Sequence, residues 1–227
     1  NAIVFGHSHL ISNSNLETSL NGLVFNKKNP NKIFGEEKGE LNNNIIQINY
    51  TKTLELKIGF FIGGNKNFGH WLLNHLGRLS ILSELDFDLP IVVPNNLPER
   101  YLDCINFFLK KNYKIIKIPP STKCTFKELY FSNMPWFIDL KMTWFSHESA
   151  KYLNKNFIKK NKNKSKNKKI FLSRELSKWR KLSNENEIWE QLKNLGFKKI
   201  HLENLTINEQ INLGGQCEVV VSVFGAG

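Results

Sequence analysis

Strands and helices alternate twice along this chain of 227 residues, and a run of lysines separates the two alternating stretches. In the first stretch, apolar segments at 56–62, 91–93 and 113–118 predict strands, and 128–132 is a candidate for a fourth. Residues 69–84 and 99–111 predict the helices between them, the second starting after Pro98. A further helix is expected near 146–158, before the lysine run. A strand–helix–strand order indicates a parallel sheet. We therefore expect an α/β fold.

The same alternation restarts after the lysine run. Three apolar segments predict strands, at 169–173, 197–202 and 218–223, and the last of them is predicted to be buried. Two pairs of capping residues predict the helices between them: Asn184 with Glu187, and Thr206 with Glu209. The second stretch is therefore predicted to be a βαβαβ unit, which is half of a nucleotide-binding fold.

Two α/β stretches joined by a tether predict two Rossmann-like lobes that face a cleft. The expected segments are an N-terminal lobe at 1–145, a helix with a Lys/Asn-rich linker at 146–168, and a C-terminal lobe at 169–227. The last segment is short for a complete domain. Because the chain starts with Asn1 and stops after a strand, we expect further sequence before Asn1 and after Gly227, so that the second lobe is truncated and only partial.

The positive charge is concentrated in the linker. The chain has a net charge of +12, and residues 159–169 contain seven lysines but no aromatic side chain. A run of this kind buries no apolar surface and is typical of a solvated segment. It also has no aromatic side chain on which a single-stranded nucleic acid stacks. We therefore expect a linker and no nucleic-acid partner; the opposite hypothesis predicts a steep salt dependence of binding that disappears when 159–169 is deleted.

Cysteine and histidine spacing limits the cellular location and the cofactors. The three cysteines are widely spaced and form no CxxC pair, which favours a reduced, intracellular protein. No stretch has the about 18 consecutive apolar residues of a spanning helix. Four histidines show no metal-ligand spacing with an acidic residue: His7, His9, His147 and His201. We expect no metal and no cofactor, and a cytoplasmic location that includes peripheral association with the inner face of the membrane.

Arginine is rare, and its positions predict an anion site. The chain has 28 Lys but only four Arg, and Arg174 and Arg180 follow the first strand of the second lobe. The planar guanidinium binds phosphate in a bidentate way that Lys does not reproduce. Gly225, Ala226 and Gly227 follow the third strand, where backbone N–H groups approach a phosphate closely. These residues predict a diphosphate site at the sheet edge; the alternative is surface ion pairs and a simple turn.

The first lobe offers a candidate catalytic group. At 100° per residue, His70, Asn74 and Arg78 share the helix face opposite the leucines. Asn74 and Arg78 are predicted to bind substrate there. His70 stands at the helix start after a strand, where a neutral imidazole accepts a proton from a hydroxyl group. The alternative is a histidine that packs at a helix end. His75 points toward the Trp71 side and is predicted to be structural.

These segments resemble the glycosyltransferase family 61 pattern. FGHWLLNHLGRL at 68–79 is similar to G-H-W-L-x-E/D-x-L-P-R-L, and SRELSKWRKLSNENE at 173–187 is similar to S-R-x(4–5)-R-x-L-x-N-E-x-E. LTINEQINL at 205–213 is similar to L-S-x-x-E-Q, and FGAG at 224–227 to H-G-A-G. The four motifs stand in the family's order, and the chain looks like a bacterial-type member with an incomplete C-terminal lobe.

The resemblance implies a GT-B fold with an acceptor-side first lobe and a second lobe that binds a nucleotide sugar. It implies inverting transfer from a UDP-sugar, such as UDP-N-acetylglucosamine (UDP-GlcNAc) or UDP-xylose, to a glycan or another hydroxyl acceptor in polysaccharide biosynthesis. It also implies that Arg174 and Arg180 hold the donor phosphates without a metal. Glu209, in the third motif, is a further donor-lobe candidate beside its capping role.

The sequence departs from the family pattern at four positions. Asn74 and His75 occupy the acidic positions of the first motif, Gly77 replaces Pro, and Phe224 replaces the His before GAG. His70 is therefore the candidate base. The departures also keep an alternative open, a non-catalytic nucleotide- or carbohydrate-binding module. A nucleotide-dependent dehydrogenase has less support, because no GxGxxG follows a strand.

Overall fold

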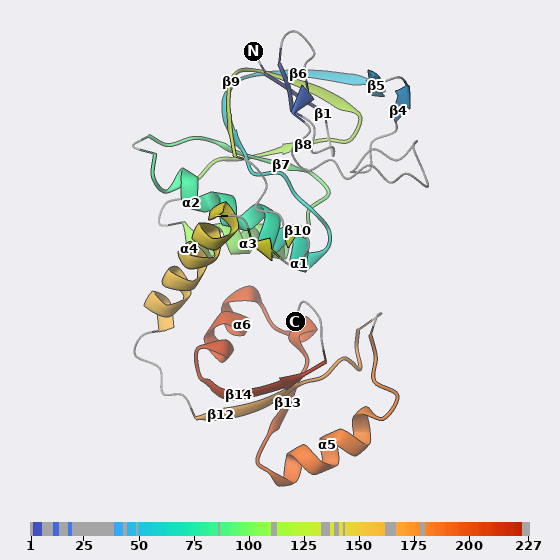
Figure 1. Ribbon diagram of the computed structural model, residues 1–227, viewed down its shortest axis with the longest axis vertical. Helices are drawn as coiled ribbons and strands as arrows, with labels where there is room; N and C mark the ends of the chain where they lie inside the picture. The colour runs from blue at the N-terminus through green and yellow to red at the C-terminus, as the bar shows by residue number, and fades with distance from the viewer. Residues whose placement is uncertain are drawn as a thin grey trace. The chain divides into compact units, whose positions relative to one another are not determined.

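The computed structural model describes most of the chain in two compact units, Asn1–Tyr152 and Leu153–Gly227 (Figure 1). The described residues are 2–5, 11–13, 18–19, 39–42, 45–48, 50–85, 87–109, 113–132, 137–138, 141–142, 144–161, 167–177 and 180–223. Each unit is mixed α/β, so the predicted fold class is confirmed at this level. The GT-B arrangement of the two lobes stays a prediction, as do the lobe boundaries at 1–145, 146–168 and 169–227.

A mixed sheet forms the first unit. Its strands, in sheet order, are β3 (Thr18–Ser19), β2 (Ile11–Asn13), β1 (Ala2–Phe5), β9 (Thr122–Phe131), β6 (Lys52–Phe61), β7 (Ile91–Pro94) and β8 (Ile115–Ile118). The pairs β9–β6, β6–β7 and β7–β8 are parallel, which confirms the expected parallel sheet. The pairs from β3 to β9 are antiparallel.

Two further strand pairs stand outside this sheet. They are β4 (Gly39–Asn42) with β5 (Ile45–Ile48), and β10 (Phe137–Ile138) with β11 (Lys141–Met142).

The core of the first unit lies where β6, β7 and β9 meet. Phe61, Val92 and Phe126 are fully or almost fully buried there. β6 and β9 are ten residues long and pair along nearly their whole length. The sequence predicted only the end of β9, at 128–132. The segment before it alternates buried and half-buried side chains with a period of two, which is the pattern of a strand with one face on the core.

The helix predicted at 69–84 is broken into four short pieces, so the expectation of one regular helix was wrong. They are α1 (Phe68–His70), a π-helical turn η1 (Trp71–His75), a 3₁₀ turn η2 (Leu76–Arg78) and α2 (Leu79–Leu82). Asn67 caps the start, because its side chain accepts a hydrogen bond from the backbone N–H of His70. Leu76 and Leu79 are buried, as the leucine spacing predicted.

Two longer helices complete the first unit. Helix α3 (Glu99–Phe108) follows Pro98, as expected, and ends three residues before the predicted limit at 111. Helix α4 (Trp144–Asn161) contains the predicted helix at 146–158 and runs into the second unit.

The second unit is the parallel βαβαβ arrangement that the sequence predicted. Its strands are β12 (Lys168–Leu172), β13 (Lys198–Ile200) and β14 (Cys217–Ser222), in the order β13-β12-β14. Helix α5 (Glu185–Asn194) and helix α6 (Ile207–Gly214) lie on opposite sides of this sheet (Figure 1). A short 3₁₀ turn, η3 (Leu202–Asn204), precedes α6. Trp189 of α5 stacks on Phe171 of β12, with ring centroids 6.3 Å apart.

Two expectations for the second unit were wrong. β14 was predicted to be buried, yet Val220 is 50% exposed and Val219 is exposed as well, because β14 is an edge strand in the described sheet. Asn184 was predicted to cap α5 together with Glu187, but its side chain makes no capping hydrogen bond. The backbone of Asn184 has φ −111° and ψ 30°, which is not the extended conformation that a capping side chain uses.

Candidate functional site

The carboxyl ends of the three strands of the second unit lie at one level of the sheet. Leu172 of β12 is in register with Ile200 of β13 and with Ser222 of β14. The backbone N–H of Ser173 also donates to the carbonyl of Ile200, with N and O 2.9 Å apart. Residues that follow these strands therefore start from the same edge, where open parallel sheets bind their ligands.

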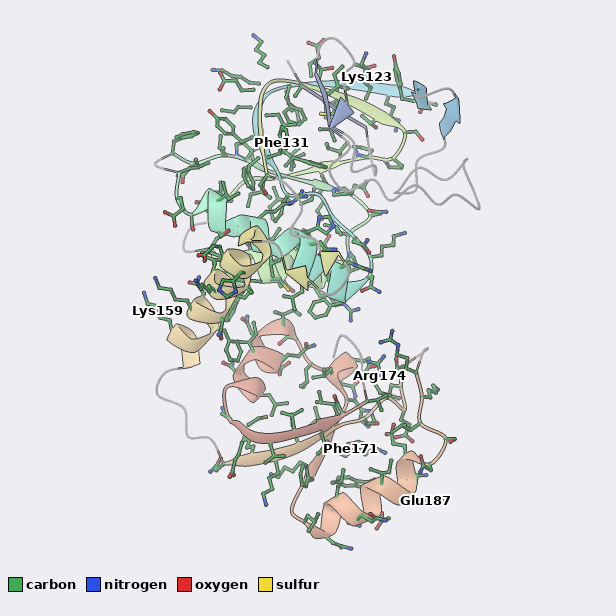
Figure 2. The ribbon with its side chains drawn as sticks, viewed as in Figure 1. Lys123, Phe131, Lys159, Phe171, Arg174 and Glu187 are labelled. Carbon is green, nitrogen blue, oxygen red and sulfur yellow. The ribbon has the colours of Figure 1, made fainter. Side chains whose placement is uncertain are left out.

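Arg174 follows β12 at this edge, as Figure 2 shows. Its backbone N–H donates to Oε2 of Glu185 over 3.0 Å, and the hydroxyl of Ser173 donates to Oε1 of the same carboxylate. The hydroxyl oxygen of Ser173 in turn accepts from the backbone N–H of Glu175 over 3.2 Å. The turn that carries Arg174 is therefore tied to the first residue of α5.

Lys199 lies between the carboxylates of Glu175 and Glu185, and a histidine lies near Glu175. Nζ of Lys199, on β13, lies 2.9 Å from Oε2 of Glu175 and 3.5 Å from Oε1 of Glu185. His201 follows β13, and its Nε2 lies 4.0 Å from Oε2 of Glu175. The buried Nδ1 of His201 has no hydrogen-bond partner. This group of charged side chains stands directly beside Arg174 on the sheet edge.

The pKa of Glu185 reflects two opposed effects. Burial raises it, but the hydrogen bonds from Ser173 and Arg174 and the proximity of Lys199 lower it more, so its pKa lies below the ordinary value. Lys199 has a raised pKa, because it donates to Glu175 and lies near Glu185. The two side chains are therefore a stable pair of opposite charges near neutral pH.

Arg180 is exposed and lies on the same connection between β12 and α5. Its backbone adopts φ 56°, in the left-handed region. A non-glycine residue held in that region costs about 1–3 kcal/mol, and such residues cluster at functional sites. Arg174 and Arg180 thus leave the same strand end. Gly225, Ala226 and Gly227 lie outside the described residues, so their meeting with the two arginines stays a prediction.

Glu209 completes a capping box at the start of α6, as the sequence predicted. Its carboxylate accepts from the backbone N–H and the hydroxyl of Thr206, over 2.7 and 2.8 Å, and its own N–H donates to the Thr206 hydroxyl over 3.2 Å. These hydrogen bonds lower the pKa of Glu209. The structure therefore assigns Glu209 a helix-capping contact; its role as a donor-lobe residue stays a prediction.

In the first unit, two side chains of the broken helix hold the carboxyl end of β6. Nδ1 of His75 lies 3.1 Å from the backbone oxygen of Ile62, and Nη1 of Arg78 donates to the same oxygen over 3.1 Å. Gly63 allows this close approach, because its φ is +75° and a Cβ there would lie 2.8 Å from Nδ1 of His75. The predicted structural role of His75 is consistent with these contacts.

An aromatic stack fixes the same turn from the other side. The ring of Trp71 lies parallel to that of Tyr101 at 5.8 Å and close to parallel with the imidazole of His75 at 6.1 Å. The hydroxyl of Tyr101 donates to the backbone oxygen of Lys66 over 2.7 Å. Trp71 is completely buried. The π-helical turn is therefore held between the end of β6 and helix α3.

Arg78 is buried, with 5% of its surface exposed. Burial lowers the pKa of its guanidinium to about 10, so the group keeps its charge near neutral pH. The sequence placed Arg78 on one face with His70 and Asn74 as a substrate-binding group. The structure places Nη1 of Arg78 on the Ile62 backbone oxygen and Nδ2 of Asn74 on His70. Substrate binding by Arg78 and Asn74 stays a prediction.

His70 is exposed, and its partner Asn74 is buried. Nδ2 of Asn74 lies 3.2 Å from Nδ1 of His70. An amide N–H is a donor, so a neutral imidazole that accepts it at Nδ1 carries its own proton on Nε2. If the amide is rotated by 180°, its oxygen accepts from Nδ1–H and a lone pair remains on Nε2. The orientation of Asn74 therefore decides whether His70 presents an acid or a base.

Sequence reasoning missed the contact of Glu185 with the end of β12, because the acidic residues of the NENE segment are explained by the start of a helix alone. It also gave no role to Lys199, and it considered His201 only as a metal ligand. The signal for Glu185 was present in the motif that joins Ser173 and Arg174 to the NENE segment. That signal was hidden, because an acidic residue at a helix start has a sufficient local explanation.

The described residues contain neither a metal-binding cluster nor a membrane-spanning helix. Among them, no three or more His, Cys, Asp or Glu side chains are arranged to hold a metal ion. None of the helices in the described segments has the length and the apolar character needed to cross a membrane.

A family model described as Glycosyltransferase 61 matches residues 68–227. The match starts at Phe68, the first residue of α1, and includes the whole second unit. A search of the curated proteins and a search of the solved structures gave no match.

Proposed function

The chain belongs to the glycosyltransferase 61 family, and on this basis we propose that it transfers a sugar from a UDP-sugar to a hydroxyl acceptor with inversion. Family membership implies glycosyltransferase activity in general. The donor, such as UDP-GlcNAc or UDP-xylose, the glycan or other hydroxyl acceptor, the inversion and a role in polysaccharide biosynthesis are our proposal. A cytoplasmic location with peripheral membrane association is proposed with it.

Donor binding is proposed at the sheet edge of the second unit. The observation that carries this proposal is the position of Arg174, which lies two residues after the end of β12 and is tied through its backbone to Glu185. A guanidinium at this edge, with Arg180 on the same connection, suits the two negative charges of a diphosphate. In the proposed complex these arginines and the 225–227 segment hold the UDP diphosphate and stabilise the charge that develops on it.

The bond changes of the proposed reaction are simple. The acceptor hydroxyl loses its proton to a base, and its oxygen forms a bond to the anomeric carbon of the sugar. The bond from that carbon to the β-phosphate oxygen breaks, and its electron pair leaves with UDP. Attack opposite the leaving group inverts the anomeric configuration. We assign the base to His70, with the amide of Asn74 turned so that Nε2 is free of its proton.

The donor site is tested by replacing Arg174 with Ala and measuring UDP binding by calorimetry. Loss of a charge-assisted contact worth about 1.5–3 kcal/mol should weaken UDP binding by about 10- to 100-fold. Lys181→Ala is the matched control. Lys181 is exposed on the same connection, and its replacement removes the same charge as the replacement of Arg174. Unchanged affinity in Arg174→Ala, or an equal loss in the control, would contradict the placement of the diphosphate.

Turnover separates transfer from binding alone. The departures at Asn74 and Phe224 keep the binding-module alternative open. Release of UDP from a UDP-sugar in the presence of a hydroxyl acceptor, abolished in His70→Ala, is the result expected for the enzyme. Binding of UDP without release of product in the wild type would favour the non-catalytic module.

A further inference from the structure

Glu185 has an environment that a helix-start residue does not require. It is the first residue of α5 and only 7% exposed, whereas Asn186 and Glu187 next to it are exposed. An acidic residue in the first turn interacts favourably with the helix dipole from an exposed position, as Glu187 does. Burying a carboxylate costs free energy unless hydrogen bonds and a cation compensate it. The burial of Glu185 therefore points to a second role.

Every contact of this carboxylate is directed at the end of β12 or at β13. Oε1 accepts from the hydroxyl of Ser173, and Oε2 accepts from the backbone N–H of Arg174 over 3.0 Å. Lys199 supplies the compensating positive charge at 3.5 Å. The carboxylate thus accepts hydrogen bonds from two consecutive residues of the turn that leaves the sheet, Ser173 and Arg174.

We propose that Glu185 is a positioning residue, which holds the backbone of Arg174 so that its guanidinium is aimed at the donor phosphates. This inference rests on the proposed donor site. A hydrogen bond to the backbone N–H fixes the peptide plane beside the Cα atom, and so restricts the direction in which the side chain leaves the turn. Ordering this turn before the donor arrives reduces the conformational cost of binding.

The inference differs from a purely structural role in what it predicts for UDP binding. If Glu185 acts through Arg174, its effect on affinity disappears once Arg174 is gone. If Glu185 only stabilises the unit, its loss weakens binding to the same extent with or without Arg174. A double-mutant cycle distinguishes the two, because it measures the energetic coupling between two residues.

The experiment compares Glu185→Gln with Glu187→Gln, which removes the same charge from the same helix turn. UDP affinity of the full chain is measured by calorimetry, and exchange of the Arg174 backbone N–H by NMR. We expect Glu185→Gln to bind UDP about tenfold more weakly, which is the size of effect seen when a residue that supports a binding site is replaced. The backbone N–H of Arg174 should exchange at least about tenfold faster in this variant. Glu187→Gln should remain within about twofold of the wild type.

The double variant decides the outcome. Arg174→Ala combined with Glu185→Gln should bind UDP within about twofold of Arg174→Ala alone, because the two changes act on one contact. Independent, additive losses would overturn the inference. So would wild-type affinity in Glu185→Gln while Arg174→Ala is weakened, and the donor site would then stand. Wild-type affinity in Arg174→Ala overturns the donor site itself, whatever Glu185→Gln does.

A second variant covers the case in which Glu185→Gln does not fold. Ser173→Ala removes the hydroxyl that donates to Oε1 and leaves the carboxylate in place. We expect UDP binding about threefold weaker, with no further loss when it is added to Arg174→Ala. Wild-type affinity in Ser173→Ala, together with an unchanged exchange rate of the Arg174 N–H, would overturn the inference.

Discussion

Replacing Gly63 with Ala tests how the end of β6 is held. Gly63 has φ +75°, and a Cβ there would lie 2.8 Å from Nδ1 of His75. The change therefore has two costs. An L-residue in the left-handed region costs about 1–2 kcal/mol. Displacing the imidazole also breaks its buried contact with the Ile62 oxygen, at about 1–3 kcal/mol. We expect the first unit to lose about 2–5 kcal/mol of its free energy of unfolding.

Gly196 supplies the matched control. It also has a positive φ, +82°, but a Cβ there would have no heavy atom within 4 Å. Gly196→Ala should therefore cost only the backbone part, about 1–2 kcal/mol, in the second unit. The smaller flexibility of Ala in the unfolded chain affects both variants alike. The difference between the two losses isolates the contact with His75.

Hydrogen exchange as a function of urea is the suitable assay, because amides of β6 and of β12 report the stability of each unit separately. A third variant checks the assigned cause. In a His75→Ala background the imidazole is absent, so Gly63→Ala should cost about as little as Gly196→Ala. The reasoning is refuted if Gly63→Ala costs no more than Gly196→Ala, or if its cost is the same with and without His75.

Two further predictions concern His70 and Glu185. Asn74→Asp places a carboxylate where the family motif has an acidic residue. This carboxylate should accept a hydrogen bond from Nδ1–H of His70 and so leave a lone pair on Nε2. We expect kcat to rise roughly tenfold while the KM for the donor stays constant. A fall in kcat with the fold intact would contradict the assignment of His70 as the base. The pKa of Glu185 is lower in the folded state than its ordinary value of 4.5. The ionised carboxylate therefore stabilises the fold fully above pH 4.5, and this stabilisation is lost as the pH falls through the pKa of the folded state. Acid unfolding of the wild type should therefore be steeper below pH 4.5 than that of Glu185→Gln, with Glu187→Gln like the wild type, and identical slopes would contradict it.

The parts of the fold that were predictable are those set by local patterns. The strands at β6, β7, β12 and β13 follow from short apolar runs bounded by glycine, proline or polar residues. The capping box of Thr206 and Glu209 was predicted correctly, because both partners lie within four residues. In the first unit, the position of His75 near Trp71 followed from counting around a helix.

The parts that were not predictable depend on neighbours distant in sequence. The exposure of Val219 and Val220 depends on which strand stands at the sheet edge, and an apolar run alone does not report this. The burial of Glu185 depends on the turn after β12, where Arg174, eleven residues earlier, donates its backbone N–H to the carboxylate. The 225–227 segment lies outside the described residues, so the predicted phosphate turn is still to be tested.

Because of the π-helical turn at Trp71–His75, the number of residues between His70 and Leu76 decides which side chain contacts the His70 imidazole. A turn of this kind contains one residue more than an α-helical turn. Deleting one residue between Trp71 and Asn74 would let the backbone close as a regular helix, with Leu76 and the residues after it keeping their places. The amide of Asn74 would then no longer lie within hydrogen-bond distance of the His70 imidazole. A single-codon loss there would change the protonation partner of the imidazole although His70, Asn74 and Arg78 were all retained.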